Sequence, residues 1–300
     1  MMFADQILQG ILLGAYYALI ACGLSFLFGV MRIINLAHGS IAVLSAYLVW
    51  SIAQQFGISP FLGLLAAVPI MAAAGYLLQR TIFERSLRSG PLTPLLSTFG
   101  LAVILDNSMF QRFGADTRSL APAIGDLSFA GWSGPGGIEV GQLAVLTLVV
   151  AVALLGALQL FLSYTPLGRA IRACAEDPET AELVGIDARN VYAAATAIAL
   201  VTVAIAGTFL AMRSTFDPYA GPKQLIFAFE AVVIGGTGSL WGTLIGGIVL
   251  GVAQNLGSQI SPQGFLIGGH VVFLLALAAR FVLAGRDWRG FLPARKRAPA

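Results

Sequence analysis

Residues 163–189 read Ser-Tyr-Thr-Pro-Leu-Gly-Arg-Ala-Ile-Arg-Ala-Cys-Ala-Glu-Asp-Pro-Glu-Thr-Ala-Glu-Leu-Val-Gly-Ile-Asp-Ala-Arg, the longest strongly charged segment of a mostly apolar chain. Thr165-Pro166 and Asp177-Pro178 each pair a helix-capping residue with a proline suited to the first helical position. Gly185 is the residue type typical of the position after a helix. The segment therefore predicts two short capped helices that dock a soluble partner, or else an ordinary solvated loop between two membrane spans.

Composition assigns the chain to the integral membrane proteins. It has 300 residues, of which 58% are hydrophobic and 10% charged, whereas soluble domains carry roughly 25% charged residues. Its 35 glycines suit transmembrane helices that pack through small residues. The two cysteines, Cys22 and Cys174, indicate neither a disulfide framework nor a metal site. The net charge of +3 is spread through the loops, so we expect no nucleic-acid partner.

Apolar runs define the expected membrane spans, each of about 20 residues. They cover residues 7–30, 33–54, 59–80, 92–112, 140–163, 190–212 and 264–284. A further region, 223–256, is interrupted by glycines and predicts two shorter or broken helices. We expect an all-α polytopic bundle of about eight or nine transmembrane helices that begins with an uncleaved first span. Residues 1–285 would form a single transmembrane domain, and 286–300 a basic tail.

Positive charge predicts the orientation. Of the 17 Lys and Arg residues, 13 lie in residues 80–90, in 163–189, in the tail, or at span ends as Arg32 and Arg280. The positive-inside rule places these segments in the cytoplasm. Residues 113–139 then face outward. An odd number of crossings with an outside N-terminus fits best, in a multi-pass protein of the cell (inner) membrane.

The chain lacks a nucleotide-binding loop. Its two lysines, Lys223 and Lys296, lie outside any G-x-x-x-x-G-K-[ST] pattern. If the protein does ATP-driven work, a separate subunit must hydrolyse the nucleotide. That subunit would dock on the helix pair in 163–189. We expect no cofactor and no metal.

Polar residues at the start of the second span form one candidate site. Asn35, His38, Gly39 and Ser40 lie in or near hydrocarbon, where an unsatisfied polar group costs several kcal/mol. They either line a translocation path or bond neighbouring helices together.

The glycine-rich stretch 228–256 is the other candidate. Glycines at spacing four predict close helix contacts, and a break at 235–239 leaves backbone groups that protein or water must cover. Glu230 is an intramembrane carboxylate, and by default a functional candidate; alternatively it lies near the interface or pairs with an arginine. The path or packing residues here are Glu230, Gly235, Gly236, Gly238 and Ser239. Asp106, Asn107 and His270 are further polar residues inside spans.

Three motifs together resemble a known family, over nearly the whole chain. Residues 17–40 (Tyr-Ala-Leu-Ile-Ala-Cys-Gly-Leu-Ser-Phe-Leu-Phe-Gly-Val-Met-Arg-Ile-Ile-Asn-Leu-Ala-His-Gly-Ser) resemble the amino-terminal signature of branched-chain amino-acid ABC transporter permeases. Residues 165–173 with Asp177-Pro-Glu resemble that family's cytoplasmic coupling loop. Residues 230–251 are similar to its Gly-rich carboxy-terminal motif.

The resemblance implies a set of partners and a function. It implies a membrane subunit of a leucine–isoleucine–valine uptake system, paired with a second permease in a heterodimer or homodimer. Two cytoplasmic ATP-binding subunits and an extracytoplasmic substrate-binding protein would complete the importer. Relatives that move urea, short amides or sugars leave the substrate open. The residues expected to couple to the ATPase are Thr165, Pro166, Gly168, Arg169, Arg172, Asp177, Pro178 and Gly185.

Two other functions stay open from the residues alone. An intramembrane hydrolase would use Ser239 as nucleophile and His38 or His270 as base, which requires about 3 Å between them. A proton-coupled carrier would use Glu230 or Asp106, but it gives the helix pair in 163–189 no purpose.

Overall fold

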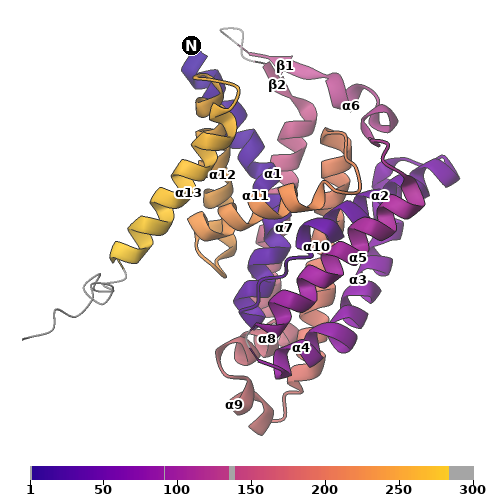
Figure 1. The fold of residues 1–300 in the computed structure, drawn as a ribbon, viewed down its shortest axis with the longest axis vertical. Helices are drawn as coiled ribbons and strands as arrows, with labels where there is room; N and C mark the ends of the chain where they lie inside the picture. The colour runs from indigo at the N-terminus through magenta and orange to yellow at the C-terminus, as the bar shows by residue number, and fades with distance from the viewer. Residues whose placement is uncertain (1, 91, 135–138, 284–300) are drawn as a thin grey trace, which may run out of the picture.

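The computed structural model describes residues 2–90, 92–134 and 139–283, and it is a bundle of helices (Figure 1). The helices are α1 (Met2–Met31), α2 (His38–Phe56), α3 (Pro60–Leu78), α4 (Glu84–Arg88), α5 (Thr93–Phe113), α6 (Asp126–Phe129), α7 (Gln142–Tyr164), α8 (Pro166–Glu176), α9 (Pro178–Leu183), α10 (Ala188–Arg213), α11 (Gly221–Gly235), α12 (Leu240–Ser258) and α13 (Gly264–Leu283). A π-helical turn, η1 (Gln79–Phe83), joins α3 to α4, and η2 (Ala121–Ile124) is a 3-10 turn. Strands β1 (Gly131–Ser133) and β2 (Glu139–Gly141) form one antiparallel hairpin. The expected all-α class is confirmed; the expected basic tail, 286–300, lies outside the described residues.

Most of the predicted spans coincide with helices able to cross a membrane, but those predicted at 33–54 and 92–112, which form α2 and α5, are not among them. In the described chain, six helices are long and apolar enough to cross a membrane, in α1, α3 with its continuation to Leu87, α7, α10, α12 and α13. The interrupted region divides as expected, into α11 and α12 with a break between Gly235 and Leu240. At about 1.5 Å per residue, the 15 residues of α11 extend about 22 Å, short of the roughly 30 Å hydrocarbon core. The predicted eight or nine crossings therefore depend on how α2, α5 and α11 are counted.

Helices α1 and α10 form the centre of the bundle. The apolar stretch of α1 is 83% buried and that of α10 is 78% buried, whereas α7 is 22% buried and α13 only 6%. The outer helices present large exposed side chains such as Leu65, Leu160 and Leu274. A surface this apolar suits contact with lipid or with another membrane chain. In Figure 1, α13 leans away from the other helices, and its free face is correspondingly wide.

Glycine rows bring the backbones of α1 and α12 into direct contact. A Cβ added to Gly247 would lie 2.6 Å from the carbonyl oxygen of Gly14, and one added to Gly10 would lie 2.6 Å from Cα of Val252. Real Cβ atoms do not approach that closely, so each position requires glycine. A Cβ on Gly246 would collide with the Ala231 carbonyl on α11. The small-residue rows predicted for 238–251 are therefore helix contacts.

The two ends of the bundle carry different loops. At one end, Nε2 of Gln9 in α1 donates to the Glu139 carbonyl oxygen at 2.6 Å, which places the β hairpin beside the N-terminus. At the other end, Ile171 and Cys174 of α8 pack with Phe26 and Val30 near the end of α1. Figure 1 shows the hairpin at the top and α4, α8 and α9 at the bottom. The basic segments 80–90 and 163–189, which charge alone assigned to one side, thus lie together.

Candidate functional site

Helices α8 and α9 are capped as the sequence predicts. Oγ1 of Thr165 accepts the Gly168 N–H at 2.9 Å, and the Asp177 carboxylate accepts the N–H groups of Glu179 and Thr180, each at 3.1 Å. The Thr180 hydroxyl and these N–H groups hold the pKa of Asp177 below its usual range. Gly185 follows α9 with φ +87°, the left-handed conformation that favours glycine. Pro166 and Pro178 each stand in a first turn.

Helix α8 packs on the bundle through three small or apolar residues of one face. Gly168, Ile171 and Cys174 are buried, whereas Leu167 is 36% exposed. Gly168 lies directly on the last turn of α7, where a Cβ would collide with the Phe161 carbonyl. Burial raises the pKa of the Cys174 thiol, so Cys174 serves as an apolar packing residue.

The two arginines of α8 lie in different surroundings. Arg169 is exposed, and its Nη1 donates to the Tyr164 carbonyl oxygen at 3.3 Å. Arg172 lines a cavity of about 220 Å³ between α8 and the break before α12, where Gly29 and Gly238 are also found. Both arginines are exposed and open to a soluble partner.

An exposed apolar pair lies at the tip of the same segment. Leu183 is 87% exposed and Val184 is 73% exposed, in a stretch that is otherwise charged. Neither residue was predicted as part of a site. Two consecutive apolar residues directly before Gly185 could have indicated an exposed contact surface, because a helix as short as α9 cannot bury both. Exposed apolar residues outside the lipid-facing surface are typical of protein docking sites.

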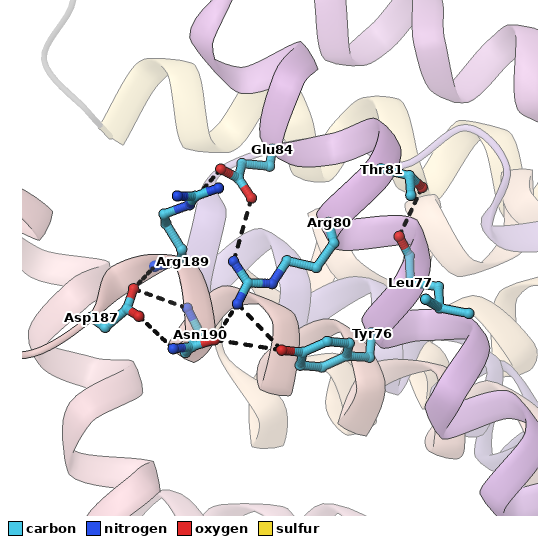
Figure 2. Close-up of polar contacts among 8 residues, drawn as sticks. All are labelled: Tyr76, Leu77, Arg80, Thr81, Glu84, Asp187, Arg189 and Asn190. Atoms are coloured by element: carbon cyan, nitrogen blue, oxygen red, sulfur yellow. Dashed lines mark hydrogen bonds and ion pairs between the residues drawn. The ribbon is translucent and has the colours of Figure 1, made fainter.

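A polar network at the same end joins the η1–α4 segment to the start of α10 (Figure 2). Oε1 of Glu84 lies 2.6 Å from Nε of Arg189, and Oε2 lies 3.7 Å from Nη1 of Arg80. The Arg80 guanidinium also donates to Oδ1 of Asn190. Asp187 caps α10 by accepting the Arg189 N–H at 3.0 Å. The network holds the segment before α10 against the turn after α3.

Two side chains of the π-helical turn, those of Gln79 and Arg80, form hydrogen bonds with α10. Oγ1 of Thr196 donates to Oε1 of Gln79 at 2.8 Å in a buried contact, and Arg80 donates to Asn190, six residues earlier on α10. Single π turns inside α-helices occur frequently at functional sites. Sequence reasoning used Arg80 and Arg189 only as positive charges and overlooked Glu84, since pairs far apart in sequence leave no local signal.

Polar residues at the start of α2 bond to the protein interior. Nε2 of His38 lies 2.8 Å from the Ile20 carbonyl oxygen of α1. Oδ1 of Asn35 accepts the Ala37 N–H at 3.0 Å, while its Nδ2 is buried with no hydrogen-bond partner in the described chain. Gly39 lies on α11, where a Cβ would collide with the Gly221 carbonyl. Ser40 is buried beside Gly221 as well.

The glycine-rich break is a tight junction between α11 and α12. A Cβ on Gly235 would collide with the Gly242 carbonyl, and Gly236 and Gly238 have φ of +105° and +82°. Oγ of Ser239 accepts the Gly242 N–H at 3.0 Å and caps α12. Nη2 of Arg280 donates at 3.2 Å to the carbonyl oxygen of Ile234, a backbone group near the break.

The geometry gives Ser239 no base. Within the described part of the chain, neither histidine is hydrogen-bonded to its hydroxyl: His38 contacts a backbone carbonyl, and Nδ1 of His270 is hydrogen-bonded to Glu230. Ser239 thus occupies the position of a helix cap.

Glu230 and His270 meet at membrane depth. Oε1 of Glu230 on α11 is hydrogen-bonded to Nδ1 of His270 on α13. The partner of Glu230 is thus a histidine, and not the arginine considered from the sequence. The Glu230 side chain is 4% exposed and that of His270 is 47% exposed. The contact ties the loosely packed α13 to α11.

These features define a class. The apolar outer helices and the glycine-packed contacts between them make the chain a multi-pass membrane protein. Residues 6–280 match the family described as "Branched-chain amino acid transport system / permease component". The chain belongs to this family.

Individual relatives agree with the family match. The chain is 31% identical over 268 residues to the high-affinity branched-chain amino acid transport system permease protein BraD of Pseudomonas aeruginosa, covering 86% of this chain and 87% of BraD. It is 33% identical over 266 residues to LivH of Escherichia coli, a permease protein of the same description, covering 85% and 86%. The fructose import permease protein FrcC of Rhizobium meliloti is 29% identical, covering 81% of this chain and 69% of FrcC. Each of these relatives is described as a transport permease.

Proposed function

We propose that this chain is the membrane permease subunit of an ATP-driven importer that moves branched-chain or related amino acids across the inner membrane. The observation that carries the proposal is the capped helix pair α8–α9, which presents Arg169 and the exposed Leu183–Val184 pair at the end opposite the β hairpin. It stands in a chain of the branched-chain permease family. The similarity to BraD and LivH supports amino acids as the substrate class.

The proposal places the α8–α9 end and the tail in the cytoplasm. In that position α8 and α9 would contact the ATP-binding subunits through the residues proposed above for coupling. A second permease would lie against the lipid-facing helices, and an extracytoplasmic binding protein would dock at the end with the β hairpin. Residues 1–285 would act as one permease domain in the bilayer, with 163–189 as its coupling loop and 286–300 as its basic cytoplasmic tail.

Packing suggests how movement of α8 would reach the bundle. Ile171 and Cys174 lie on the end of α1, and the Glu84–Arg189 pair joins the start of α10 to the turn after α3. Helices α1 and α10 are the buried centre. A tilt of α8–α9 when the ATPases close would therefore be transmitted to the central helices. Asn35, His38 and Gly39 lie at the start of α2, where it meets α1 and α11. We assign them, with Glu230 and the glycines of the break, to the translocation path or its packing.

Purification of the detergent-solubilised protein expressed from its own operon, with co-purifying chains identified by mass, tests the proposal. We expect an ATPase with a nucleotide-binding loop and a second permease. Leu183→Asp should lose the ATPase and keep the second permease. Phe129→Asp alters an 84% exposed aromatic residue at the opposite end and should keep both. A lone homo-oligomer without an ATPase would overturn the assignment.

A further inference from the structure

The cavity beside Arg172 lies at the α8 end of the bundle, between α7, α8, the end of α1 and the break before α12. Its volume is about 220 Å³. Apolar side chains from all four segments form most of its walls: Phe26, Val30, Leu162, Ile171 and Leu240. Two polar side chains complete the lining, the guanidinium of Arg172 and the amide of Gln159, and none of the described lining residues is a carboxylate. The cavity therefore carries a net positive charge.

The two polar side chains of the cavity have no partner within the described chain. Arg172 and Gln159 are both exposed, and neither forms a hydrogen bond or an ion pair with a described residue. Glu176 follows Arg172 at the spacing of a helical ion pair, yet the two are not paired in the structure. A guanidinium offers five N–H donors and an amide offers two. Donors from α7 and α8 thus meet at one accessible cavity, and an anion would satisfy both.

Aromatic side chains place this cavity at the edge of the bilayer. Tyr164, the last residue of α7, is 75% exposed, and Trp241 in the first turn of α12 is 44% exposed. Exposed Tyr and Trp at the ends of membrane helices are typical of the headgroup level. Gln159 precedes Tyr164 by five residues, about 7.5 Å along the helix toward the hydrocarbon, and its neighbour Leu160 is 59% exposed. The α7 wall of the cavity therefore faces lipid.

We infer that this cavity binds the phosphate group of an anionic phospholipid, with Arg172 as the cation and the Gln159 amide as a second donor. A guanidinium fork matches phosphate oxygens bidentately, and basic pockets between membrane helices suit acidic lipid headgroups. The acyl chains would lie along the exposed apolar face of α7 at Leu160. A free phosphate has the same charge but no apolar body for that face.

The inference goes beyond the proposed function and gives the two arginines of α8 different contacts. Arg172 and Ala175 line the cavity, whereas Arg169 does not. At 3.6 residues per turn, Arg169 and Arg172 lie about 60° apart around the helix. A lipid held by Arg172 would connect α8 to α7 and to the break before α12, and it would leave Arg169 to the ATPase. Arg172 would then support the coupling loop from the membrane surface.

Photolabelling in proteoliposomes that hold the assembled transporter tests the inference. The probe is phosphatidylglycerol with a diazirine in its acyl chain close to the glycerol. We expect stronger label on peptides that contain Leu160, Leu162 or Trp241 than on the α3 peptide that contains Leu65, which is 69% exposed and reports contact with bulk lipid.

Competition identifies the ligand chemistry. Excess phosphatidylglycerol should suppress the specific label, whereas the same amount of phosphatidylcholine, which has no net charge, should not. Equal suppression by the two lipids would overturn the contact between the anionic headgroup and Arg172. Millimolar inorganic phosphate should also leave the label in place. Full suppression by inorganic phosphate would show that the cavity takes a free phosphate and would overturn the lipid assignment.

Three variants separate the cavity from the general positive charge of α8. Arg172→Gln should lower the specific label about fivefold, which corresponds to about 1 kcal/mol for one arginine at an anionic surface. Gln159→Leu removes the second donor, keeps the size of the side chain, and should lower the label as well. The matched control is Arg169→Gln, which removes the same charge three residues earlier on α8 and should leave the label unchanged.

The outcomes also separate this inference from the proposed function. Equal labelling of Arg172→Gln, Arg169→Gln and the unaltered chain would overturn the lipid site. Label that appears only on permease purified without its ATPase would show that Arg172 contacts the soluble partner, and would overturn it too. None of these measurements depends on uptake. A transporter that moves no branched-chain amino acid would therefore overturn the proposed function and leave the lipid site standing.

Discussion

Oε1 of Glu84 lies 2.6 Å from Nε of Arg189, an ion pair between the segment after α3 and the first turn of α10 (Figure 2). The Glu84 side chain is 13% exposed and that of Arg189 is 55% exposed. The pair connects two basic segments that would otherwise repel each other at the same end of the bundle. It is one of the polar contacts, with that of Arg80 to Asn190, that join the end of the candidate coupling loop to the segment after α3.

The Glu84–Arg189 pair should show measurable energetic coupling. Because Arg189 is half exposed and solvent screens the charge, we expect a coupling free energy of only about 0.5–1 kcal/mol. The measurement is a double-mutant cycle of Glu84→Gln and Arg189→Gln, read from unfolding midpoints in detergent. Glu179→Gln, at an exposed position on α9, is the control and should leave the midpoint unchanged. Strictly additive effects of the two substitutions would show that the pair contributes nothing.

Arg169→Glu should uncouple ATP hydrolysis from uptake. The exposed guanidinium on α8 can hold a carboxylate of a partner bidentately, and the substitution replaces attraction by repulsion. We expect uptake per ATP to fall at least about tenfold while the protein remains in the membrane. Proteoliposome uptake, ATPase rate and immunoblotting measure the three quantities. Arg112→Glu, exposed at the opposite end, should behave as the unaltered protein; normal uptake by Arg169→Glu would contradict the assignment.

Gly14→Ala should destabilise the protein while Gly156→Ala should not. A Cβ on Gly14 would collide with the backbone of Gly247 and Ile248, whereas one on Gly156 meets nothing within 4 Å. Overpacking against backbone costs about 1–3 kcal/mol, and alanine in an open helix position gains up to about 1 kcal/mol over glycine. Thermal midpoints of the two purified variants measure the difference. Equal midpoints would show that α1 and α12 can separate at no cost.

The cap of α9 should depend on pH. The pKa of Asp177 is lowered in the folded protein, chiefly because the Thr180 hydroxyl and N–H bind the carboxylate. Its stabilising contribution is therefore present above the usual aspartate pKa and is lost as pH falls through the lowered folded value. At neutral pH, amide hydrogen exchange in residues 178–184 should be faster in Asp177→Ala, while Asp177→Asn should retain the cap. Identical protection in Asp177→Ala and the unaltered chain would argue against the cap.

Local signals account for the parts of the fold that could be predicted. The helix starts at Thr165-Pro166 and Asp177-Pro178 are capped by hydrogen bonds to residues at most three positions further on. The sequence of that one turn is therefore enough to predict each cap. The lengths of the apolar runs predicted most of the membrane helices. A segment that crosses hydrocarbon must form the hydrogen bonds of its backbone within its own helix, and it therefore needs an unbroken apolar run. The distribution of Lys and Arg also predicted that the basic segments 80–90 and 163–189 lie at the same end of the bundle.

The contacts that could not be predicted join distant parts of the chain. Nothing near Glu84 indicates Arg189, and nothing near Glu230 indicates His270, because their proximity depends on how α10 and α13 pack. The burial of Gly168, next to a Leu167 that is 36% exposed, likewise depends on the end of α7, on which Gly168 packs.

The sequence by itself determined that this is a helical membrane protein with a capped helix pair between spans, since hydropathy and capping act over a few residues to one span. Only the tertiary structure decided which polar groups are satisfied. The glycine contacts set how closely α1, α11 and α12 approach. Packing also leaves Oε2 of Glu230 buried with no donor among the described residues. Hydrogen-bond satisfaction is a property of three-dimensional packing, and no pattern of neighbouring residues contains it.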